Sequence, residues 1–207
     1  MKAIAKLAVT DPAACNACGL CAKLCPVEAI SIREEQGRRM ACTDAGQCRA
    51  CTICVTRCPQ KARALEEREQ PLLLDLEVHG AFADEDVKAI CNKAHMYPEQ
   101  VVCYCYRTTA GDIARAILAG AKSPEDVSRM TGARTGCGVL CITGILRLLR
   151  AAAVELERAP GFQWYGKMAV LWDVPQNVID KYGAEYYIEA DRAAADKLFP
   201  GGDGHER

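Results

Sequence analysis

The sequence predicts an α+β protein of several parts, and three observations support this fold class. Short apolar segments alternate with cysteine-rich loops over about the first 70 of the 207 residues. Between residues 101 and 150, apolar residues instead recur at helical spacing, with glycine and proline marking the turns. The last 57 residues contain no cysteine but hold 8 of the 12 aromatic residues. We therefore expect a strand-rich domain (1–70), a connector with one helix (71–100), a small all-α helix–turn–helix domain (101–150) and an aromatic-rich, partly helical C-terminal segment (151–207).

Four short strands are expected in the first domain. Apolar and β-branched residues define them, and turn signals such as Asp11-Pro12 and Gln36-Gly37 separate them. The expected strands are Ile4–Val9, Ala29–Arg33, Arg39–Cys42 and Ala62–Leu65. The order of strand, loop and short helix occurs twice, which predicts a pseudo-twofold internal repeat. Beyond this domain, the run Leu72–Leu74 is compatible with a strand of a second domain.

Helices are expected in the connector and in the third part. Residues 84–94 have helical spacing of their apolar residues. Thr109 suits an N-cap and Gly120 a C-terminal stop, and Ser123-Pro124 starts a second helix that Gly132 ends. A third helix is expected to open at residues 135–138 and to continue through Leu149.

The C-terminal segment is divided by proline and glycine. Pro160-Gly161 and Pro175 break it, residues 177–198 are expected to be helical with a break near Gly183, and the tail 200–204 is expected to fray. Its aromatic residues either complete a small core or dock a partner subunit, since Trp and Tyr often anchor interfaces. They are Phe162, Trp164, Tyr165, Trp172, Tyr182, Tyr186, Tyr187 and Phe199.

Eight of the 14 cysteines belong to a motif that occurs twice in the sequence, C-x2-C-x2-C-x3-C-P. Three cysteines at this spacing can surround one iron–sulfur cube from a single loop, whereas the fourth follows a short helix that crosses to the other cube. We therefore assign one [4Fe–4S] cluster to Cys15, Cys18, Cys21 and Cys58. The other is assigned to Cys25, Cys48, Cys51 and Cys54.

Other uses of these eight cysteines fit the sequence less well. Disulfides are typical of secreted chains, and Met1–Lys6 is not followed by the apolar run of a signal peptide. A zinc ribbon uses two C-x2-C pairs rather than two runs of four. Residues 1–68 resemble the bacterial two-cluster ferredoxins, and the resemblance implies a ferredoxin-like fold that transfers electrons.

A third group of cysteines consists of a C-x-C pair and a C-x3-C pair, with two helices expected between them. The residues are Cys103, Cys105, Cys137 and Cys141. Together with Gly120, Ser123-Pro124-Glu125 and Thr135-Gly136-Cys137-Gly138, they make residues 101–149 resemble the [2Fe–2S] domain of bacterioferritin-associated ferredoxin. The same helical module occurs in nitrite reductases and in some amino-acid-oxidising flavoenzymes. The family pairs its last two cysteines as C-x2-C, so this chain departs from it by one residue.

The sequence leaves three possibilities for what the third group of cysteines binds. A [2Fe–2S] cluster is favoured, a structural zinc on the same four cysteines is the second reading, and an empty or differently occupied site is the third. If the third helix begins by Cys137, its thiol and that of Cys141 would share one helical face. The N-terminus of that helix would then favour an anionic cluster by lowering the thiol pKa.

Two cysteines are left without a metal assignment. We interpret Cys42 and Cys91 as small buried hydrophobic residues. Cys91 also forms a C-x3-H pair with His95, for which a core cysteine and a helix-end histidine are favoured over a metal site.

Composition and charge limit the classes of molecule that this chain is expected to bind. The net charge is −1, which implies no broad basic face for nucleic acid or anionic lipid. We find no apolar stretch long enough to span a bilayer, and no phosphate-binding or dinucleotide motif. Residues 1–70 carry 11 basic against 8 acidic residues, which fits a fixed subunit better than a freely diffusing acidic ferredoxin. We expect a cytoplasmic location, because the cysteine content favours metal binding over disulfides. Since such clusters usually tolerate oxygen poorly, we also expect an anaerobic or protected interior.

These observations predict an iron–sulfur electron-transfer subunit of a multisubunit oxidoreductase, with no catalytic residues of its own. The resemblance of residues 101–149 implies a flavoprotein dehydrogenase subunit as partner, acting on a small organic substrate such as an amine, amino acid or hydroxy acid. The assembly would be a hetero-oligomer, and a soluble electron carrier is a further partner. The alternatives are an iron or Fe–S handling protein, and a free ferredoxin shuttle with a zinc-stabilised extension.

Overall fold

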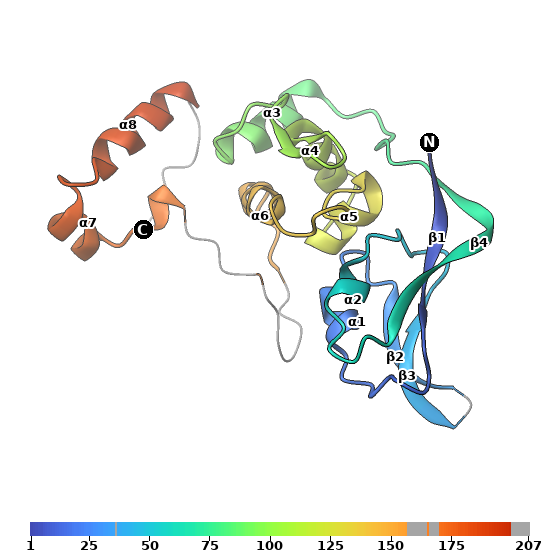
Figure 1. The fold of residues 1–207 in the computed structure, drawn as a ribbon. Helices are drawn as coiled ribbons and strands as arrows, with labels where there is room; N and C mark the ends of the chain where they lie inside the picture. Colours follow the sequence, from blue (N-terminus) through green and yellow to red (C-terminus); the bar gives the residue numbers. More distant parts are fainter. Residues whose placement is uncertain (36, 157–164, 166–169, 200–207) are drawn as a thin grey trace.

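The computed structural model describes residues 1–35, 37–156, 165 and 170–199 (Figure 1). A strand-rich unit at the N-terminus is followed by a helical unit made of α3 to α6, and then by the two helices α7 and α8. Within these ranges no helix is both long and apolar enough to cross a membrane. The expected break at Pro160-Gly161 and the expected frayed tail at 200–204 lie outside the described residues.

The strand-rich unit consists of two antiparallel pairs. Strand β1 (Lys2–Thr10) pairs with β4 (Arg63–Leu74), and β2 (Ile30–Glu35) pairs with β3 (Arg38–Thr43). The alternating apolar residues of β1 place Ile4 and Ala8 in the interior, as expected for a strand with one face buried. Between the strands lie two short helices, α1 (Leu20–Leu24) and α2 (Ile53–Thr56).

Strand β4 is longer than the sequence analysis expected. The run Leu72–Leu74 does not belong to a second domain, because it continues β4 and pairs with residues 2–4 of β1. The register shifts between Ile4 and Lys6, so an irregularity absorbs the charged stretch that separates the two apolar parts of β4. A pairing partner 70 residues away decided this assignment, and no local pattern reveals such a partner.

The core of the strand-rich unit is unusual in its composition. It has nine buried members among the described residues, and four of them are cysteines. The others are small or medium apolar residues: Ala8, Val27, Ala29, Ile30 and Ala41. Few large apolar side chains are therefore present to stabilise this unit, and its interior is arranged around sulfur atoms.

The helical unit has a conventional apolar core. Helices α3 (Asp84–Lys93), α4 (Ala110–Leu118), α5 (Pro124–Thr131) and α6 (Ile142–Ala151) pack around residues such as Ile113, Val127, Ile145 and Leu148, which are fully buried. Because Val87 and Cys91 of α3 join this core, the helix expected in the connector is part of the unit.

Local sequence explains the helix ends of this unit. Thr109 caps α4 because its hydroxyl oxygen accepts a hydrogen bond from the Asp112 backbone N–H, while the Asp112 carboxylate accepts one from the Thr109 backbone N–H. Ser123 caps α5 because its hydroxyl oxygen accepts a hydrogen bond from the Asp126 backbone N–H, ahead of Pro124 at the first helical position. Gly120 and Gly132 have φ values of 103° and 75°, as required of residues that end a helix in the left-handed region.

The helical unit is not purely α-helical, contrary to expectation. A small hairpin of β5 (Val101–Cys103) and β6 (Thr108–Thr109) precedes α4. The β-branched residues Val101, Val102, Thr108 and Thr109 favour extended backbone here. The hairpin holds the C-x-C pair in and next to its turn.

Side chains join the strand-rich and helical units. The Arg129 guanidinium of α5 pairs with the Glu28 carboxylate at 2.7 Å and donates to the Val27 carbonyl oxygen at 3.3 Å. The Lys2 ammonium lies 3.7 Å from the ring centroid of Tyr106. The two units are therefore in direct contact, as Figure 1 shows for α5 and the region of α1 and α2.

The C-terminal segment folds back onto the helical unit. After a 3-10 turn at Leu171–Asp173 come α7 (Gln176–Tyr182) and α8 (Ile188–Leu198), with the expected break at Gly183. The ring of Trp172 stacks on His95 with centroids 3.6 Å apart, and Arg150 forms a bidentate ion pair with Asp173 at 2.7 and 2.8 Å. Trp172 thus covers the end of α3, which fits the covering role considered for the aromatic residues.

We predict that Ile113→Ala lowers the free energy of unfolding of the helical unit by about 2–5 kcal/mol, because it leaves a cavity among fully buried side chains. Leu118→Ala on the same helix is the matched control, since Leu118 is 38% exposed. Chemical denaturation followed by far-ultraviolet circular dichroism measures both. Equal losses in the two variants would contradict the core described here.

Candidate metal centres

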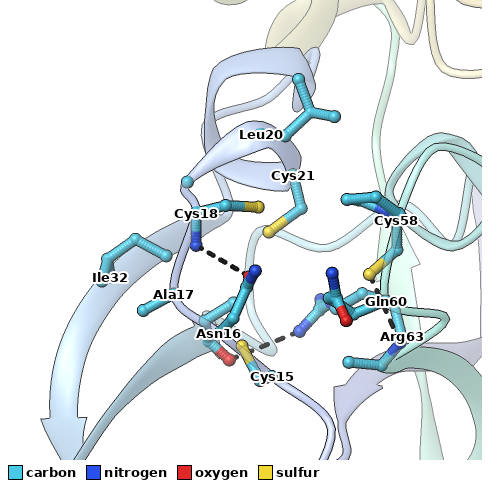
Figure 2. Close-up of a pocket in the computed structure, with 14 residues that line it drawn as sticks. Cys15, Asn16, Ala17, Cys18, Leu20, Cys21, Ile32, Cys58, Gln60 and Arg63 are labelled. Atoms are coloured by element: carbon cyan, nitrogen blue, oxygen red, sulfur yellow. Dashed lines mark hydrogen bonds between the residues drawn. The ribbon is translucent and has the colours of Figure 1, made fainter.

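The first pocket of the strand-rich unit is lined by four cysteines. Cys15, Cys18 and Cys21 come from the loop before α1 and from α1 itself, and Cys58 follows α2. Their sulfur atoms point toward one shared space (Figure 2). The remaining lining is mostly apolar, with Leu20, Ile32, Ala41 and Ala62.

A second pocket repeats this arrangement. It is lined by Cys48, Cys51 and Cys54 from the second loop and by Cys25 from the end of α1. Ala8, Val27, Ala29, Ile30 and Ile53 complete most of the wall. Each pocket thus brings together the four cysteines to which the sequence analysis assigned a common cluster, three from one loop and one from the other.

The two loops share an uncommon backbone conformation. Positive φ values occur at positions 33 residues apart in the two copies: Ala17 (57°) and Ala50 (52°), Gly19 (78°) and Thr52 (66°), Glu28 (54°) and Lys61 (52°). This agreement in the backbone fits the expected internal repeat. A β-branched residue such as Thr52 rarely adopts a left-handed conformation, so the loop accepts local strain to keep its shape.

Backbone N–H groups face the crossing cysteines in both halves. The Ala29 N–H donates to Cys25 Sγ at 3.2 Å, and the Ala62 N–H donates to Cys58 Sγ at 3.3 Å. Such donors stabilise negative charge on sulfur. They are at matching positions, four residues after each crossing cysteine.

Burial opposes ionisation of four pocket cysteines in the absence of a metal: Cys21, Cys25, Cys51 and Cys54. It raises the pKa of the Cys51 thiol to about 12, although the Ile53 backbone N–H acts in the opposite direction. It likewise raises the pKa of the Cys25 thiol. A buried cysteine becomes a thiolate readily when a metal supplies the compensating positive charge. A donor set of four soft sulfur atoms in an apolar wall therefore fits an iron–sulfur cluster.

The third group of cysteines lies in the helical unit. Cys103 ends β5, Cys105 is in the turn of the hairpin, Cys137 is in the loop after α5, and Cys141 is the residue before α6. Cys103 and Cys141 are buried, whereas Cys105 and Cys137 are exposed. The structure brings the four together as two facing pairs, Cys103 with Cys141 and Cys105 with Cys137.

Hydrogen bonds within this group shift the thiol pKa values. The Cys141 thiol donates to Cys103, which lowers the pKa of Cys103 to about 5 and raises that of Cys141. The two shifts have opposite signs because one thiol donates the hydrogen bond and the other accepts it. Backbone N–H groups of Leu140 and Val139 lower the pKa of the Cys137 thiol. The loop therefore supplies donors for negatively charged sulfur, as a cluster site requires.

The third helix begins later than expected. Helix α6 starts at Ile142, so Cys137 and Cys141 do not share a helical face and Cys137 is not in a helix. Gly138 has a φ of 78°, and a left-handed residue at this point prevents the helix from extending back to Cys137. Cys137 instead approaches Cys105 from a loop.

Gly136 permits this approach. A Cβ atom at position 136 would lie 2.6 Å from Cys105 Cβ and 2.7 Å from Cys105 Sγ, which is far inside van der Waals contact. Only glycine therefore lets the loop pass so close to the C-x-C pair.

The sequence analysis missed two arginines. The backbone N–H of Arg134 faces the sulfur atoms of both Cys103 and Cys141, while its buried guanidinium pairs with Glu125 at 2.9 Å. Arg63 lies in the wall of the first pocket. Nothing in the local pattern marks either residue, because arginine in a strand or loop normally faces solvent.

The remaining cysteines are away from these pockets. The Cys42 thiol donates to the Met40 carbonyl oxygen at 3.7 Å, and Cys91 is fully buried in the helical core, where burial raises its pKa to about 11. His95 is stacked on Trp172 rather than directed at Cys91 as a ligand pair. In the described parts of the chain, no three histidine, cysteine, aspartate or glutamate side chains are close enough to hold one single metal ion.

Comparison with protein families agrees with both resemblances. Residues 14–62 match the model of the 4Fe-4S dicluster domain, and residues 101–151 match that of the BFD-like [2Fe-2S] binding domain. The chain therefore contains, in this order, a domain type that binds two [4Fe–4S] clusters and one that binds a [2Fe–2S] cluster. Searches of curated proteins and of solved structures found no match to this chain.

We predict that Gly136→Ala abolishes the [2Fe–2S] signal in electron paramagnetic resonance (EPR), because the added methyl group displaces Cys105. The [4Fe–4S] signals should be retained. Gly46→Ala is the matched control, since its added Cβ meets nothing closer than Asp44 Oδ1 at 3.4 Å. An unchanged [2Fe–2S] spectrum in Gly136→Ala would show that the loop does not need this close approach.

Proposed function

We propose that this chain, with its dicluster and BFD-like domains, is the electron-transfer subunit of a multisubunit oxidoreductase. It relays single electrons between a flavoprotein dehydrogenase subunit and an external redox partner. When bound, iron–sulfur clusters accept and release one electron at a time. The observation that carries the proposal is the presence of three separate cysteine groups in one chain, each arranged for a cluster.

The proposed ligands follow the grouping of the cysteines. Cys15, Cys18, Cys21 and Cys58 would hold the first [4Fe–4S] cluster, and Cys25, Cys48, Cys51 and Cys54 the second. Cys103, Cys105, Cys137 and Cys141 would hold the [2Fe–2S] cluster. The shared pockets, the N–H donors toward sulfur and the facing cysteine pairs support this partition.

Contacts between the two units support a continuous path. Gly138 follows Cys137 of the third group, and a Cβ atom at this position would lie 2.6 Å from Cδ1 of Ile53. Ile53 lies between Cys51 and Cys54 of the second group. The loops that carry the second and third groups therefore touch, so the second group would be the middle station of the relay.

Exposure of the cysteines supports the same order. Cys18 of the first group is exposed, and so are Cys105 and Cys137 of the third. No cysteine of the second group is exposed, and three of its four are buried. A relay with two accessible ends and a buried middle is suited to passing electrons between two different partners.

The assignment of a flavoprotein partner rests on the occurrence of the helical module in flavoenzymes. A flavin delivers two electrons, which one-electron centres then pass on singly. In the alternative function of an iron or Fe–S handling protein, the clusters would be labile, and the buried middle site argues against ready release. In the other alternative, a free shuttle, the purified chain would be a monomer without a flavin subunit.

Anaerobic iron, sulfide and zinc analysis combined with EPR of the dithionite-reduced protein tests the proposal. About ten irons per chain, with a [2Fe–2S] signal beside two coupled [4Fe–4S] signals, is the expected result. About eight irons and one zinc would make the helical unit a structural module and confine electron transfer to the first domain. Co-purification with a flavin-containing subunit from the native source tests the partner.

We predict that Cys141→Ser changes only the [2Fe–2S] signal and leaves both [4Fe–4S] signals intact, because its thiol faces Cys103 of the same group. Cys91→Ser and Cys42→Ser are the controls, and each should leave the iron content unchanged. Loss of a [4Fe–4S] signal in Cys141→Ser would refute the ligand partition. A drop in iron in either control would make that cysteine a ligand.

A further inference from the structure

One charged side chain lies between the two pockets of the strand-rich unit. Arg63, the first residue of β4, is only 3% exposed. It lines the first pocket together with Cys15, Cys21 and Cys58 (Figure 2). Its Nη2 atom also lies 3.9 Å from Sγ of Cys54, which belongs to the second pocket. A single guanidinium group therefore adjoins both cysteine groups.

Neutral oxygen atoms hold this guanidinium in place. It donates to the hydroxyl groups of Thr10 and Thr43, the latter at 2.6 Å. It also reaches the carbonyl oxygens of Ala41 at 3.4 Å and Ala8 at 3.5 Å. These contacts tie β1, β3 and β4 together, so Arg63 has a structural role whatever else it does.

The positive charge has no carboxylate counterpart in the described structure. Among the described residues, Arg63 forms no ion pair with an aspartate or glutamate, and its buried Nε has no hydrogen-bond partner. Arginine remains charged in proteins, and a buried charge without a partner is strongly unfavourable. The fold must therefore compensate this charge in another way.

The two cysteine groups are the available source of negative charge. Arg63 lines the first pocket beside Cys21, and its Nη2 atom lies 3.9 Å from Sγ of Cys54 in the second. Arg63 therefore acts electrostatically on both sites. Four thiolates around a cluster leave a net negative charge, which is the missing counterpart.

We propose that Arg63 is a cation shared by the two [4Fe–4S] sites, and that it raises the reduction potential of both clusters. The inference rests on the proposed ligand partition. Reduction of each site adds one electron from an external donor and forms or breaks no bond, so the negative charge of that site increases by one. A buried cation stabilises this added charge, and the effect is large where water does not screen it. A shared cation shifts both potentials in the same direction.

EPR-monitored redox titration of the full chain tests this proposal with four variants. Arg63→Met removes the charge and the hydrogen bonds, Arg63→Gln removes the charge but retains a hydrogen-bonding amide, and Arg63→Lys retains the charge. Arg38→Met is the matched control, because Arg38 lies at an exposed position of β3 in the same unit. The [2Fe–2S] signal of each sample is an internal reference, and thermal melting reports structural loss separately.

The expected result is that Arg63→Met and Arg63→Gln each make both [4Fe–4S] clusters about tenfold harder to reduce, a shift of about 59 mV for one electron. Arg63→Lys and Arg38→Met should leave both potentials close to those of the wild-type protein. Loss of iron from both [4Fe–4S] sites in the two neutral variants, with normal iron in Arg63→Lys, would equally support a need for the charge.

Three results would overturn the proposal. If the neutral variants melt at a lower temperature but keep unchanged reduction potentials, Arg63 has only a structural role. A shift of only one cluster would show that the cation is not shared. Loss of iron in all three Arg63 variants would show that the shape of the side chain matters rather than its charge. A wild-type chain without two [4Fe–4S] signals would instead refute the proposed function, before any variant is compared.

Discussion

The N-terminal unit depends on cysteine sulfur atoms that occupy its centre. Four of the nine buried core members there are cysteines, and most of the others are small. Such an interior buries little apolar area, so the unit cannot be stabilised by packing alone. Because the unfolded chain has no preformed set of ligands, binding of a cluster contributes directly to folding. The left-handed residues of both loops and the N–H donors toward Cys25 and Cys58 all follow from the need to direct the chain around these sulfur atoms.

The helical unit is stabilised in a different way. It has an ordinary apolar core, and its cysteines are at one edge, held by the hairpin of β5 and β6 and by the loop before α6. A stable helical core provides a rigid support on which two exposed cysteines can be presented without loss of stability. The contact of Gly138 with Ile53 and the ion pair of Arg129 with Glu28 fix this edge against the second pocket. Rigid placement of neighbouring sites is what an electron relay requires, because no bond formation guides the electron.

Much of this arrangement could be predicted from local patterns. The spacing of the cysteines predicted which four share a pocket, because a short loop can place only three ligands around one site. Caps at Thr109 and Ser123 and stops at Gly120 and Gly132 predicted the helices between the last two cysteine pairs. Three local predictions failed, and one of them is the all-α character of the helical unit, which contains the hairpin of β5 and β6. The run Leu72–Leu74 joined β4 because its partner is at the start of the chain, and α6 does not include Cys137 because Gly138 is left-handed.

The sequence by itself therefore determined the number of cysteine groups and the cysteines that each contains, since these depend on residue type and short-range spacing. Only the tertiary structure decided how the groups are ordered in space, which sulfur atoms are exposed, and that Arg63 is buried between two pockets without a carboxylate partner among the described residues. The physical reason is that contacts such as Arg63 with Thr10, or Gly138 with Ile53, join residues more than 50 positions apart. Chain packing, rather than local propensity, brings such residues together.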